Sequence, residues 1–480
     1  MTMKTFKKPN REQQLLFATV KLETIAPIGS SLRTIDELVD KLDTSKIEAT
    51  YDFETKTGAR AMHPKTLIKV ALYALHNCRF SLRKMESDTQ FHLGYRWITG
   101  DEKIDHSTMG KFLSRFASEL AELFSQVVMI GVEHDLIDFE VLNVDTVKIR
   151  ANASYKQFRD LKGIREEKKK IKKKLEDLLN DSEHEAVEEQ RILAARIEKL
   201  EWAKKELEER IKLEEVSEEK QKELRKEKRI NLTDPDCELM QQANREINSA
   251  FAITMASDAA NDFITHIKVQ EHQNDAEALI PAIEGSRETT QSRHELVNAD
   301  SGFSSVDNLE KLKEDKQNAL IPDRRMDTES RGVSSKGEYD RSHFSYDANE
   351  EVYTCPEGKR LNHKSSSKQN GRTYHLYYNQ DACKSCRYRK KCTKGKYRTI
   401  SRDENEAIKE NMRAQLKDPE NKQLYKLRAH AIESPFGQIK HNLKYRIVMR
   451  RGRTKVLMEL SLLGMLHNIL KIGDMLQIAA

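Results

Sequence analysis

The stretch LIDFEVLNVDTVKIRANASY, residues 136–155, decides the fold class, because β-branched and apolar residues here replace the helical periodicity that precedes them. LIDFEVLNV has the composition of a buried central strand, and TVKIRANA is expected to follow as a second, neighbouring strand. Asp145 is therefore expected near a strand end. HELVNAD, residues 294–300, repeats the pattern and places Asp300 at another strand terminus, where Gly302 allows a sharp turn.

A third carboxylate stands at the head of a basic stretch. In AIESPFGQIKHNLKYRIVMRRG, residues 431–452, Glu433 opens a predicted helical run, and Lys440 lies two helical turns later on nearly the same face. Three carboxylates from two strand ends and one helix can hold two divalent cations, which prefer such oxygen ligands. Each aspartate taken alone is better explained as a turn or cap residue. The basic residues expected to bind a phosphodiester backbone are Lys440, Lys444, Arg446, Arg450, Arg451 and Arg453.

The composition is that of a polar chain with neither a membrane helix nor a secretory signal. Charged residues make up 34% and hydrophobic residues 37% of 480, so part of the chain is expected to be solvated helix. No hydrophobic run approaches the roughly 18 residues that a membrane helix needs, and we expect a cytoplasmic protein. The net charge of +6 is concentrated in the Cys-rich and C-terminal regions, as in proteins that bind polyanions.

Residues 1–135 are predicted to form a helical domain. HPKTLIKVALYALHN begins a helix near Pro64, and Ser107 or Thr108 is expected to cap a long amphipathic helix. Two interpretations stay open, a DNA-docking module and a solvated helical domain with ordinary surface charge. The cations that a docking module would use are Arg79, Arg83, Lys84, Arg96, Lys111 and Arg115.

Residues 156–230 are nearly all Lys, Glu, Arg and Leu. Apolar residues at spacings of three and four in two arms predict a helical hairpin, zipped as an antiparallel coiled coil and turning at NDSEHE. The hairpin could serve dimerisation or contact DNA ends, or it could be a solvated spacer. The surrounding domain would then comprise residues 136–155, 231–322 and 400–480, with a β-hairpin turning at Asn261 and Asp262.

A second insertion, residues 323–399, contains four of the six cysteines of the chain. Cys383 and Cys386 have the C-x-x-C spacing with which one turn presents two thiolates to an ion. Cys355 and Cys392 complete a four-thiolate set for a structural Zn²⁺, for which the alternative is free thiols. Such a closed site would brace the fold and present RYRKK to DNA.

Several motifs in this order resemble the DDE transposases of bacterial insertion sequences, most closely insertion-sequence group eleven eighty-two. The N-terminal motifs are LIKVALYAL, FSLRKMES, YRWITGD and DHSTMGKF. The later motifs are VDTVKIRANAS, NLTDPD, ADSGF, the CPEG and C-x-x-C knuckle, IESPFGQIK and LHNILKI. The chain departs from the family pattern at Thr146 and Phe303, where the pattern has Gly and Tyr, respectively.

This resemblance implies a ribonuclease H-like α/β catalytic core that carries the helical N-terminal domain, the helical hairpin and the Cys-rich segment. Asp145, Asp300 and Glu433 would bind two Mg²⁺ or Mn²⁺ ions, and Lys440 would contact DNA. The implied reaction is cleavage at terminal inverted repeats, followed by attack of the 3′-hydroxyl on target DNA. The partners would be double-stranded transposon ends and target DNA, bound at the nucleoid by a homodimer or larger synaptic complex.

Two other functions stay open on the sequence. A catalytically inactive, transposase-derived protein would bind DNA and dimerise without forming a metal-dependent product. A simple two-metal nuclease would hydrolyse DNA but would never join a 3′ end to a target.

Overall fold

The computed structural model describes residues 22–51, 60–178, 184–214, 217–242, 244–272, 274–323, 326, 337–369 and 372–476. Within these ranges the side chains of residues 184–186, 218, 369, 427–434 and 476 lie outside the description. The chain divides into two compact units, Met1–His294 with Ala429–Ala480, and Glu295–Arg428. Each unit has its own hydrophobic core, and helices and strands are mixed in both, as the α/β prediction requires.

The first unit begins with short helices packed around buried aromatic and aliphatic side chains. Pro64 occupies the first turn of its helix, where the missing amide costs nothing, and His63 Nδ1 accepts a hydrogen bond from Lys65 N at 3.2 Å. The elements are η1 (Leu22–Ile25), α1 (Ser31–Lys41), α2 (Ser45–Glu48), α3 (Pro64–His76), α4 (Leu82–Phe91), α5 (Leu93–Thr99), α6 (His106–Arg115) and α7 (Ala117–Glu133).

The cap predicted at Ser107 or Thr108 was wrong by a few residues. Asp105 is the cap, and its Oδ1 accepts from the amides of Ser107 at 2.8 Å and Thr108 at 3.0 Å. The single long helix expected here is two helices, because the backbone leaves helical geometry at Phe116.

The sheet of the first unit is antiparallel, with β5 in contact with three other strands. β1 lies along one side of β5, and β4 and β6 also pair with it. The turn predicted at Asn261 and Asp262 is confirmed between β5 and β6, and Asp262 has a φ of 54°. The strands are β1 (Val141–Arg150), β4 (Glu238–Gln241), β5 (Ile247–Asp258) and β6 (Phe263–Val269).

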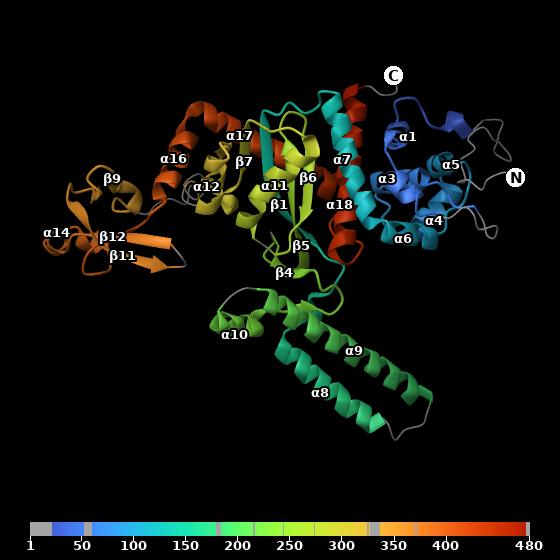
Figure 1. Cartoon of the computed structure of the whole chain (residues 1–480), viewed down its shortest axis with the longest axis horizontal. Coiled ribbons are helices and arrows are strands. Elements are labelled where there is room, and N and C mark those ends of the chain that lie inside the picture. The colour runs from blue at the N-terminus through green and yellow to red at the C-terminus, as the bar shows by residue number, and fades with distance from the viewer. Residues whose placement is uncertain are drawn as a thin grey trace. The chain divides into compact units, whose positions relative to one another are not determined.

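Two helices cover this sheet from different parts of the chain. α11 (Asp275–Thr290) contacts β6, β5 and β1, and α18 (Arg453–Leu476) packs against β6 and α7 (Figure 1). Because Gly464 has no side chain, α18 can approach Ile267 and Phe124 closely. Arg453–Met475 is long and apolar enough to cross a membrane, contrary to our expectation, but 72% of its most apolar window is buried, as in a core helix.

The inserted arm of the first unit forms the expected pair of helices, α8 (Leu161–Leu178) and α9 (His184–Leu213) (Figure 1). Leu161, Ile164, Leu200, Leu207 and Ile211 are buried between them at the base, together with Ile230 and Leu232. Arg196 pairs with Glu167 at 2.7 Å. The predicted turn lies mostly outside the described residues. η2 (Tyr155–Gln157), β2 (Phe158–Arg159), α10 (Glu218–Glu227) and β3 (Ile230–Asn231) complete the base.

The second unit contains a parallel pair of strands and a separate five-stranded antiparallel sheet. The pair and its helices are β7 (Leu296–Ala299), η3 (Ser301–Phe303), α12 (Val306–Glu314), β8 (Asn318–Leu320) and α16 (Glu406–Lys417). The five-stranded sheet has the order β13-β12-β11-β10-β9. Its strands are β9 (Ser345–Asp347), β10 (Val352–Thr354), β11 (Arg360–Gln369), β12 (Arg372–Tyr378) and β13 (Thr399–Asp403) (Figure 1). Sequence analysis did not predict this sheet.

Short helices accompany this five-stranded sheet, and one long helix links the two units in sequence. The short elements are η4 (Arg341–His343), α14 (Gln380–Lys384) and α15 (Arg389–Cys392). The boundary between the units falls inside α17 (Pro419–Gly437), which is followed by a π-helical turn, η5 (Gln438–Asn442).

Candidate active site

Asp145 lies in the middle of β1. Our prediction of a strand end was wrong, because VLNVDTVKIR is one continuous strand and not two neighbours. Asp145 faces Met255 across the antiparallel register, and its side chain is half-buried. By strand alternation it shares a face with Val147 and Ile149, which pack in the main core. This carboxylate is therefore held by a central strand, where the backbone cannot move freely.

The opposite face of β1 is fixed by a hydrogen-bonded polar group. Gln270 Nε2 donates to Thr254 Oγ1 at 2.7 Å and to Thr146 Oγ1 at 3.2 Å. Thr146, where the family pattern has Gly, therefore braces β1 against β5 next to Asp145. The residue that departs from the pattern thus has a structural role of its own.

Lys440 is far from Asp145 in the sequence, but it lies close enough in space to feel the charge of that carboxylate. It lies in η5 with its side chain half-buried. Burial lowers the pKa of Lys440, and the Asp145 carboxylate counters this by favouring the charged ammonium. A lysine that is partly desolvated and next to a carboxylate is suited to meeting an anionic group, because its charge is screened less than at an open surface.

Asp300 directly follows β7, as predicted. It caps η3, and its Oδ1 accepts a hydrogen bond from Gly302 N at 2.7 Å. The start of α17 covers the same strand, since Asn298 Nδ2 donates to Leu424 O at 3.2 Å. Phe303, where the family pattern has Tyr, is buried. Asp300 belongs to the second unit and Asp145 to the first.

Glu433 lies in α17, so its helical placement is confirmed, but its side chain lies outside the described residues. Two residues later, Pro435 removes an amide donor from the helix, and π-helical hydrogen bonding begins at Gln438. The helix predicted to continue through the basic stretch ends at Asn442. Glu433 and Lys440 therefore do not lie on one regular α-helix, and the prediction that they share a helical face was wrong.

The segment after η5 is irregular and is tied to the core of the first unit. Tyr445 is buried and donates its hydroxyl hydrogen bond to Glu459 of α18. The same carboxylate accepts from Met449 N at 2.9 Å. A buried carboxylate thus supplies hydrogen-bond partners that this irregular backbone would otherwise lack.

The same segment is also joined to the end of β1. Val448 N donates to Arg150 O at 2.9 Å, beside a parallel bridge between Arg150 and Ile447. Asn152 Nδ2 adds a hydrogen bond to Met449 O at 2.8 Å. This part of the basic stretch is therefore a structural connection between β1 and α18.

Several residues of this segment that were predicted to contact DNA interact instead with other groups of the protein. Arg450 Nε lies 3.5 Å from Glu459 Oε1, and both side chains are largely buried. Arg451 Nε donates to Asn152 O at 3.0 Å. Arg453 pairs with Glu271 at 3.3 Å, and its amide donates to Asp236 at 3.0 Å. Lys444 and Arg446 are exposed and stay candidates for DNA contact, together with Lys440.

Some of the basic residues predicted to contact DNA from the N-terminal helices also have internal partners, and others are exposed. Arg79 pairs with Asp88 at 3.4 Å, and Arg96 pairs with Asp101. Arg115 lies 4.9 Å from the ring centroid of Phe116. The three that are exposed without such a contact in the described part of the chain are Arg83, Lys84 and Lys111.

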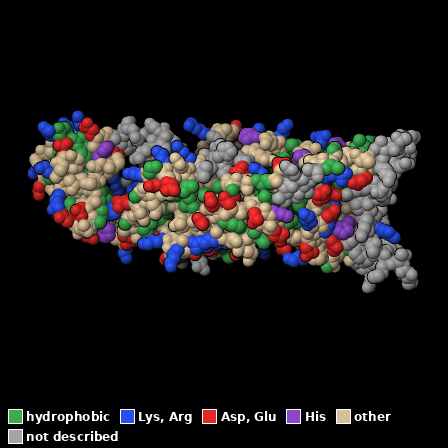
Figure 2. Space-filling model, turned by 90° about the horizontal axis from the view of Figure 1, so that it is seen from above, with side chains coloured by type: hydrophobic (Ala, Val, Ile, Leu, Met, Phe, Trp, Pro, Cys, Tyr) green, Lys and Arg blue, Asp and Glu red, His purple; other side chains and the backbone are tan. Residues whose placement is uncertain are grey.

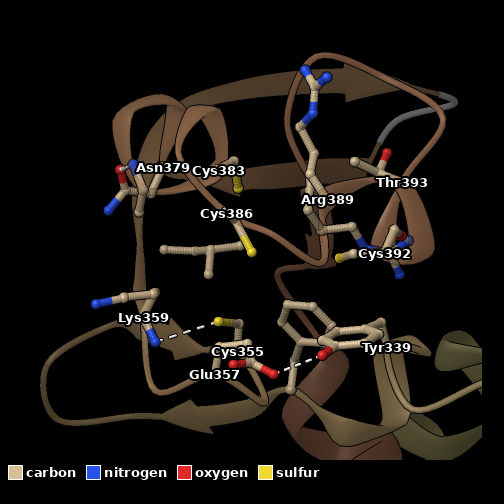
Figure 3. A pocket seen from close by; sticks show the side chains of 14 residues that line it. Tyr339, Cys355, Glu357, Lys359, Asn379, Cys383, Cys386, Arg389, Cys392 and Thr393 are labelled. Atoms are coloured by element: carbon tan, nitrogen blue, oxygen red, sulfur yellow. Dashed lines mark hydrogen bonds between the residues drawn. The ribbon is translucent and has the colours of Figure 1, made fainter.

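The four predicted zinc ligands line one small cavity in the second unit, of about 30 Å³ (Figure 3). Cys355 comes from the turn after β10, and Cys383, Cys386 and Cys392 come from the α14–α15 segment. Burial raises the pKa of the Cys392 thiol, and the other three cysteines raise it further, so the four groups are close in space. Lys359 N, at the end of the turn formed by residues 355–359, donates to Cys355 Sγ at 3.3 Å.

The cysteines converge without forming a finished metal site. Among the residues that the structure describes, no group of three or more His, Cys, Asp or Glu side chains is arranged to hold a metal ion. The donor chemistry of four thiols suits zinc. The predicted Asp145, Asp300 and Glu433 set includes one side chain, that of Glu433, that lies outside the described residues.

Two family models match separate parts of the chain. Residues 20–115 match the model described as Transposase domain (DUF772), and residues 354–473 match the model described as Transposase DDE domain. Both families are transposase domains. These matches support a transposase of the bacterial insertion-sequence kind, and such an enzyme acts on DNA. No curated protein matches the chain.

The matched ranges cover some of the predicted transposase residues. The DDE domain match includes the four cysteines, Glu433 and Lys440, whereas Asp145 and Asp300 lie before it. The helical N-terminal match ends at Arg115, the last residue of α6. The insertion-sequence group stays a prediction.

Sequence reasoning missed the β11–β12 hairpin of this chain. The sequence did mark this region as a basic surface segment, because residues 358–380 contain five Lys or Arg residues and no Asp or Glu, with serines and tyrosines between them. The composition instead predicts an irregular polar insertion, since the serine-rich strand lacks the β-branched residues typical of strands.

Proposed function

We propose that the chain is a DDE transposase that cleaves DNA at the terminal inverted repeats of its element and joins the resulting 3′-hydroxyl to target DNA. The matches to two transposase families, one in each half of the sequence, support the reaction class. The proposed catalytic core is ribonuclease H-like. The proposed partner is double-stranded DNA, processed at the nucleoid by a homodimer or a larger synaptic complex.

In this proposal Asp145, Asp300 and Glu433 hold two Mg²⁺ or Mn²⁺ ions through carboxylate oxygens. Two such ions, when bound, supply activation of the attacking oxygen and neutralisation of charge on the leaving oxygen. Asp145 is fixed by its central strand, and Asp300 by its bond to the Gly302 amide. Lys440 contacts a non-bridging phosphate oxygen and orients the strand beside Asp145.

The observation that supports the proposal is that Lys440 lies close enough to Asp145 for the carboxylate to favour its charged form. These residues come from a central strand and from a π-helical turn far away in the sequence, and they interact inside one compact unit. A structural ion pair would explain the contact as well. The coincidence with the motif positions of a transposase favours the catalytic explanation.

The test replaces each carboxylate with its amide, which keeps the shape and removes the charge. Asp145→Asn, Asp300→Asn and Glu433→Gln are each expected to lower metal-dependent cleavage of end-containing duplex by about a thousandfold or more, a loss of about 4 kcal/mol in transition-state stabilisation. DNA binding measured without divalent metal should be retained. Glu420→Gln, an exposed site on the same helix as Glu433, is the matched control and should cleave normally.

Undiminished cleavage by any of the three variants would exclude that residue as a ligand. A strand-transfer assay with pre-cut ends separates the transposase from a simple nuclease, which would leave the 3′-hydroxyl unjoined. A wild-type protein that binds DNA without forming any product under Mg²⁺ or Mn²⁺ would be the inactive relative.

We also propose that the thiolates of the four-cysteine cavity bind one structural Zn²⁺. The convergence of Cys355, Cys383, Cys386 and Cys392 supports this. Metal analysis of purified protein should find about one equivalent of zinc, lost in the Cys383→Ser/Cys386→Ser variant. A folded, metal-free protein with four titratable thiols would contradict the proposal.

A further inference from the structure

The positive charge of the chain is concentrated in one short segment. Residues 358–398 contain thirteen Lys or Arg residues and one acidic residue, Asp381, which gives the segment a net charge of +12. The whole chain carries only +6, so the remaining residues carry a net charge of −6. On the face seen in Figure 2, Lys and Arg side chains are interspersed with Asp and Glu side chains. The imbalance therefore belongs to this segment and not to the surface as a whole.

Most of these cations are free to meet a ligand. Four have internal partners, since Arg360 pairs with Glu350, Arg372 pairs with Asp307, and Arg389 and Arg398 donate to backbone carbonyls. The other nine are exposed, and no ion pair joins them to an acidic side chain in the described part of the chain. Three lie on or beside β11, namely Lys359, Lys364 and Lys368; the rest lie between residues 384 and 396.

The β11–β12 hairpin presents a polar face away from its core. Tyr377 of β12 is buried with Tyr353 and Leu361, so the alternate residues Tyr374 and Tyr378 lie on the opposite face. Across the register, Ser367 faces Tyr374, and Asn362 faces Tyr378. A β-bulge between His363 and Ser365 contains the exposed Lys364. Lys368 faces Thr373 and so lies on the Tyr377 side of the hairpin, which means that the exposed lysines are not confined to one face. Neither strand of the hairpin contains an acidic residue.

Hydrogen bonds hold the basic loop close to the end of this hairpin. Lys359 N donates to Cys355 Sγ, and Asn379 Nδ2 donates to Arg360 O at 2.8 Å, which fixes the start of α14 to β11. Cys355 and Cys392 both pack against the core below the sheet. The exposed cations of the strand and of the loop therefore belong to one rigid module.

We propose that this module, the β11–β12 hairpin with the loop at residues 384–396, is the main phosphate-backbone contact of the protein with duplex DNA. The identification of the polyanion as duplex DNA rests on the proposed function. Lysines bind phosphates independently of base sequence, so exposed lysines of the hairpin and of the loop can contact the backbone of a duplex. The segment at residues 444–453 is a weaker candidate, because Arg450 and Arg453 are held by Glu459 and Glu271.

Charge reversal in the full-length protein tests the proposal. Lys364→Glu/Lys368→Glu should lower the affinity for a random duplex at least tenfold near 0.1 M salt. The slope of log affinity against log salt should fall by about 0.9 for each phosphate that the variant no longer neutralises. The measurement is fluorescence anisotropy of a labelled duplex in EDTA, where no cleavage occurs. Failure of the transposase assignment would appear only in cleavage assays and would leave this result unchanged.

The control is Lys169→Glu/Lys173→Glu on α8, which makes the same change in net charge at two exposed lysines of the other unit. It should retain most of the affinity and most of the salt slope. Equal losses in both variants would overturn the proposal, because net charge alone would then explain binding. The proposal would also fail if the hairpin variant lost binding to phosphatidylserine-containing vesicles but kept binding to DNA. Circular dichroism should show both variants folded.

Discussion

Two histidines in the first unit are buried where only the neutral ring is stable. His266 and His467 have pKa values lowered to about 4, chiefly because burial disfavours the charged form. His467 Nε2 donates to Asp262 O at 2.8 Å, and Lys471 opposes protonation as well. Because the unfolded chain binds these protons near pH 6.5, the stabilisation is complete above pH 6.5 and is lost as the pH falls towards 4.

His467→Gln should therefore reduce the acid sensitivity of folding. The amide can still donate to Asp262 O but cannot be protonated, so it removes a pH-dependent contribution on the order of 3 kcal/mol between pH 6.5 and 4. Urea unfolding at half-unit pH steps should give a shallower pH dependence than the wild type shows. A parallel pair of curves would mean that His467 is not neutral in the fold.

At the scale of single residues, chemistry was easier to predict than position. Asp300 was placed correctly after its strand because a short apolar run and Gly302 limit the alternatives. Asp145 was misplaced because the strand continues through Val147 and Ile149. The alternation of polar and apolar residues does not show where a strand stops pairing with its neighbours. The internal partners of Arg450 and Arg453 were not predictable, since they come from segments distant in the sequence.

Helix packing against the first sheet depends on a close approach at Gly464. A Cβ there would lie 2.5 Å from Ile267 Cδ1 and 3.0 Å from Phe124 Cε2, so any side chain must displace these two buried side chains. Gly464→Leu should destabilise the fold by about 2 kcal/mol or more, since overpacking outweighs the gain of about 1 kcal/mol in helix propensity. The change in the free energy of unfolding can be measured in urea.

Gly337→Leu is the control for this variant. No atom lies within 4 Å of a Cβ built at Gly337, and the expected change is below about 0.5 kcal/mol. Equal stability of the Gly464 variant and the wild type would show that the helix can shift without loss.

Among the elements, most helices were predictable and the first sheet was predicted in part, since β1 was expected as two strands. The five-stranded sheet was not predicted. The helical arm at residues 161–213 follows from spacings of three and four, and its ion pairs, such as Lys168 with Glu201, follow from its composition. β11 has a run of three serines flanked by lysines, a pattern with no local preference for a strand. It becomes a strand because β10 and β12 supply partners on both sides.

The whole molecule has two compact units with separate cores, which predicts unfolding in more than one step. Calorimetry should show two transitions. Tyr353→Ala, in the core of the five-stranded sheet, should lower the midpoint of one transition and leave the other in place, because a large aromatic-to-alanine change costs about 3–5 kcal/mol locally. A single transition that shifts as a whole would show that the units unfold together.

The division of charge over the molecule was only partly predictable. The sequence alone shows that the Cys-rich segment has an excess of basic residues. It does not show that a β-hairpin carries part of this excess, or that Arg360 and Arg372 are neutralised by ion pairs. Exposure depends on which side of a strand faces a core, and that is decided by the register with distant strands.

Asn468 has a consequence for the behaviour of the protein at high concentration. β6 pairs with β5 only, and Asn468 accepts from Ile264 N at 3.0 Å and donates to Ile264 O at 2.8 Å. Strands with unsatisfied peptide groups recruit strands of other molecules and so start fibrils. Ile264 is buried inside the fold, so other molecules can reach these peptide groups only after α18 has detached. Loss of the Asn468 amide leaves both groups without this partner and favours detachment, so the protein is expected to aggregate at a lower temperature.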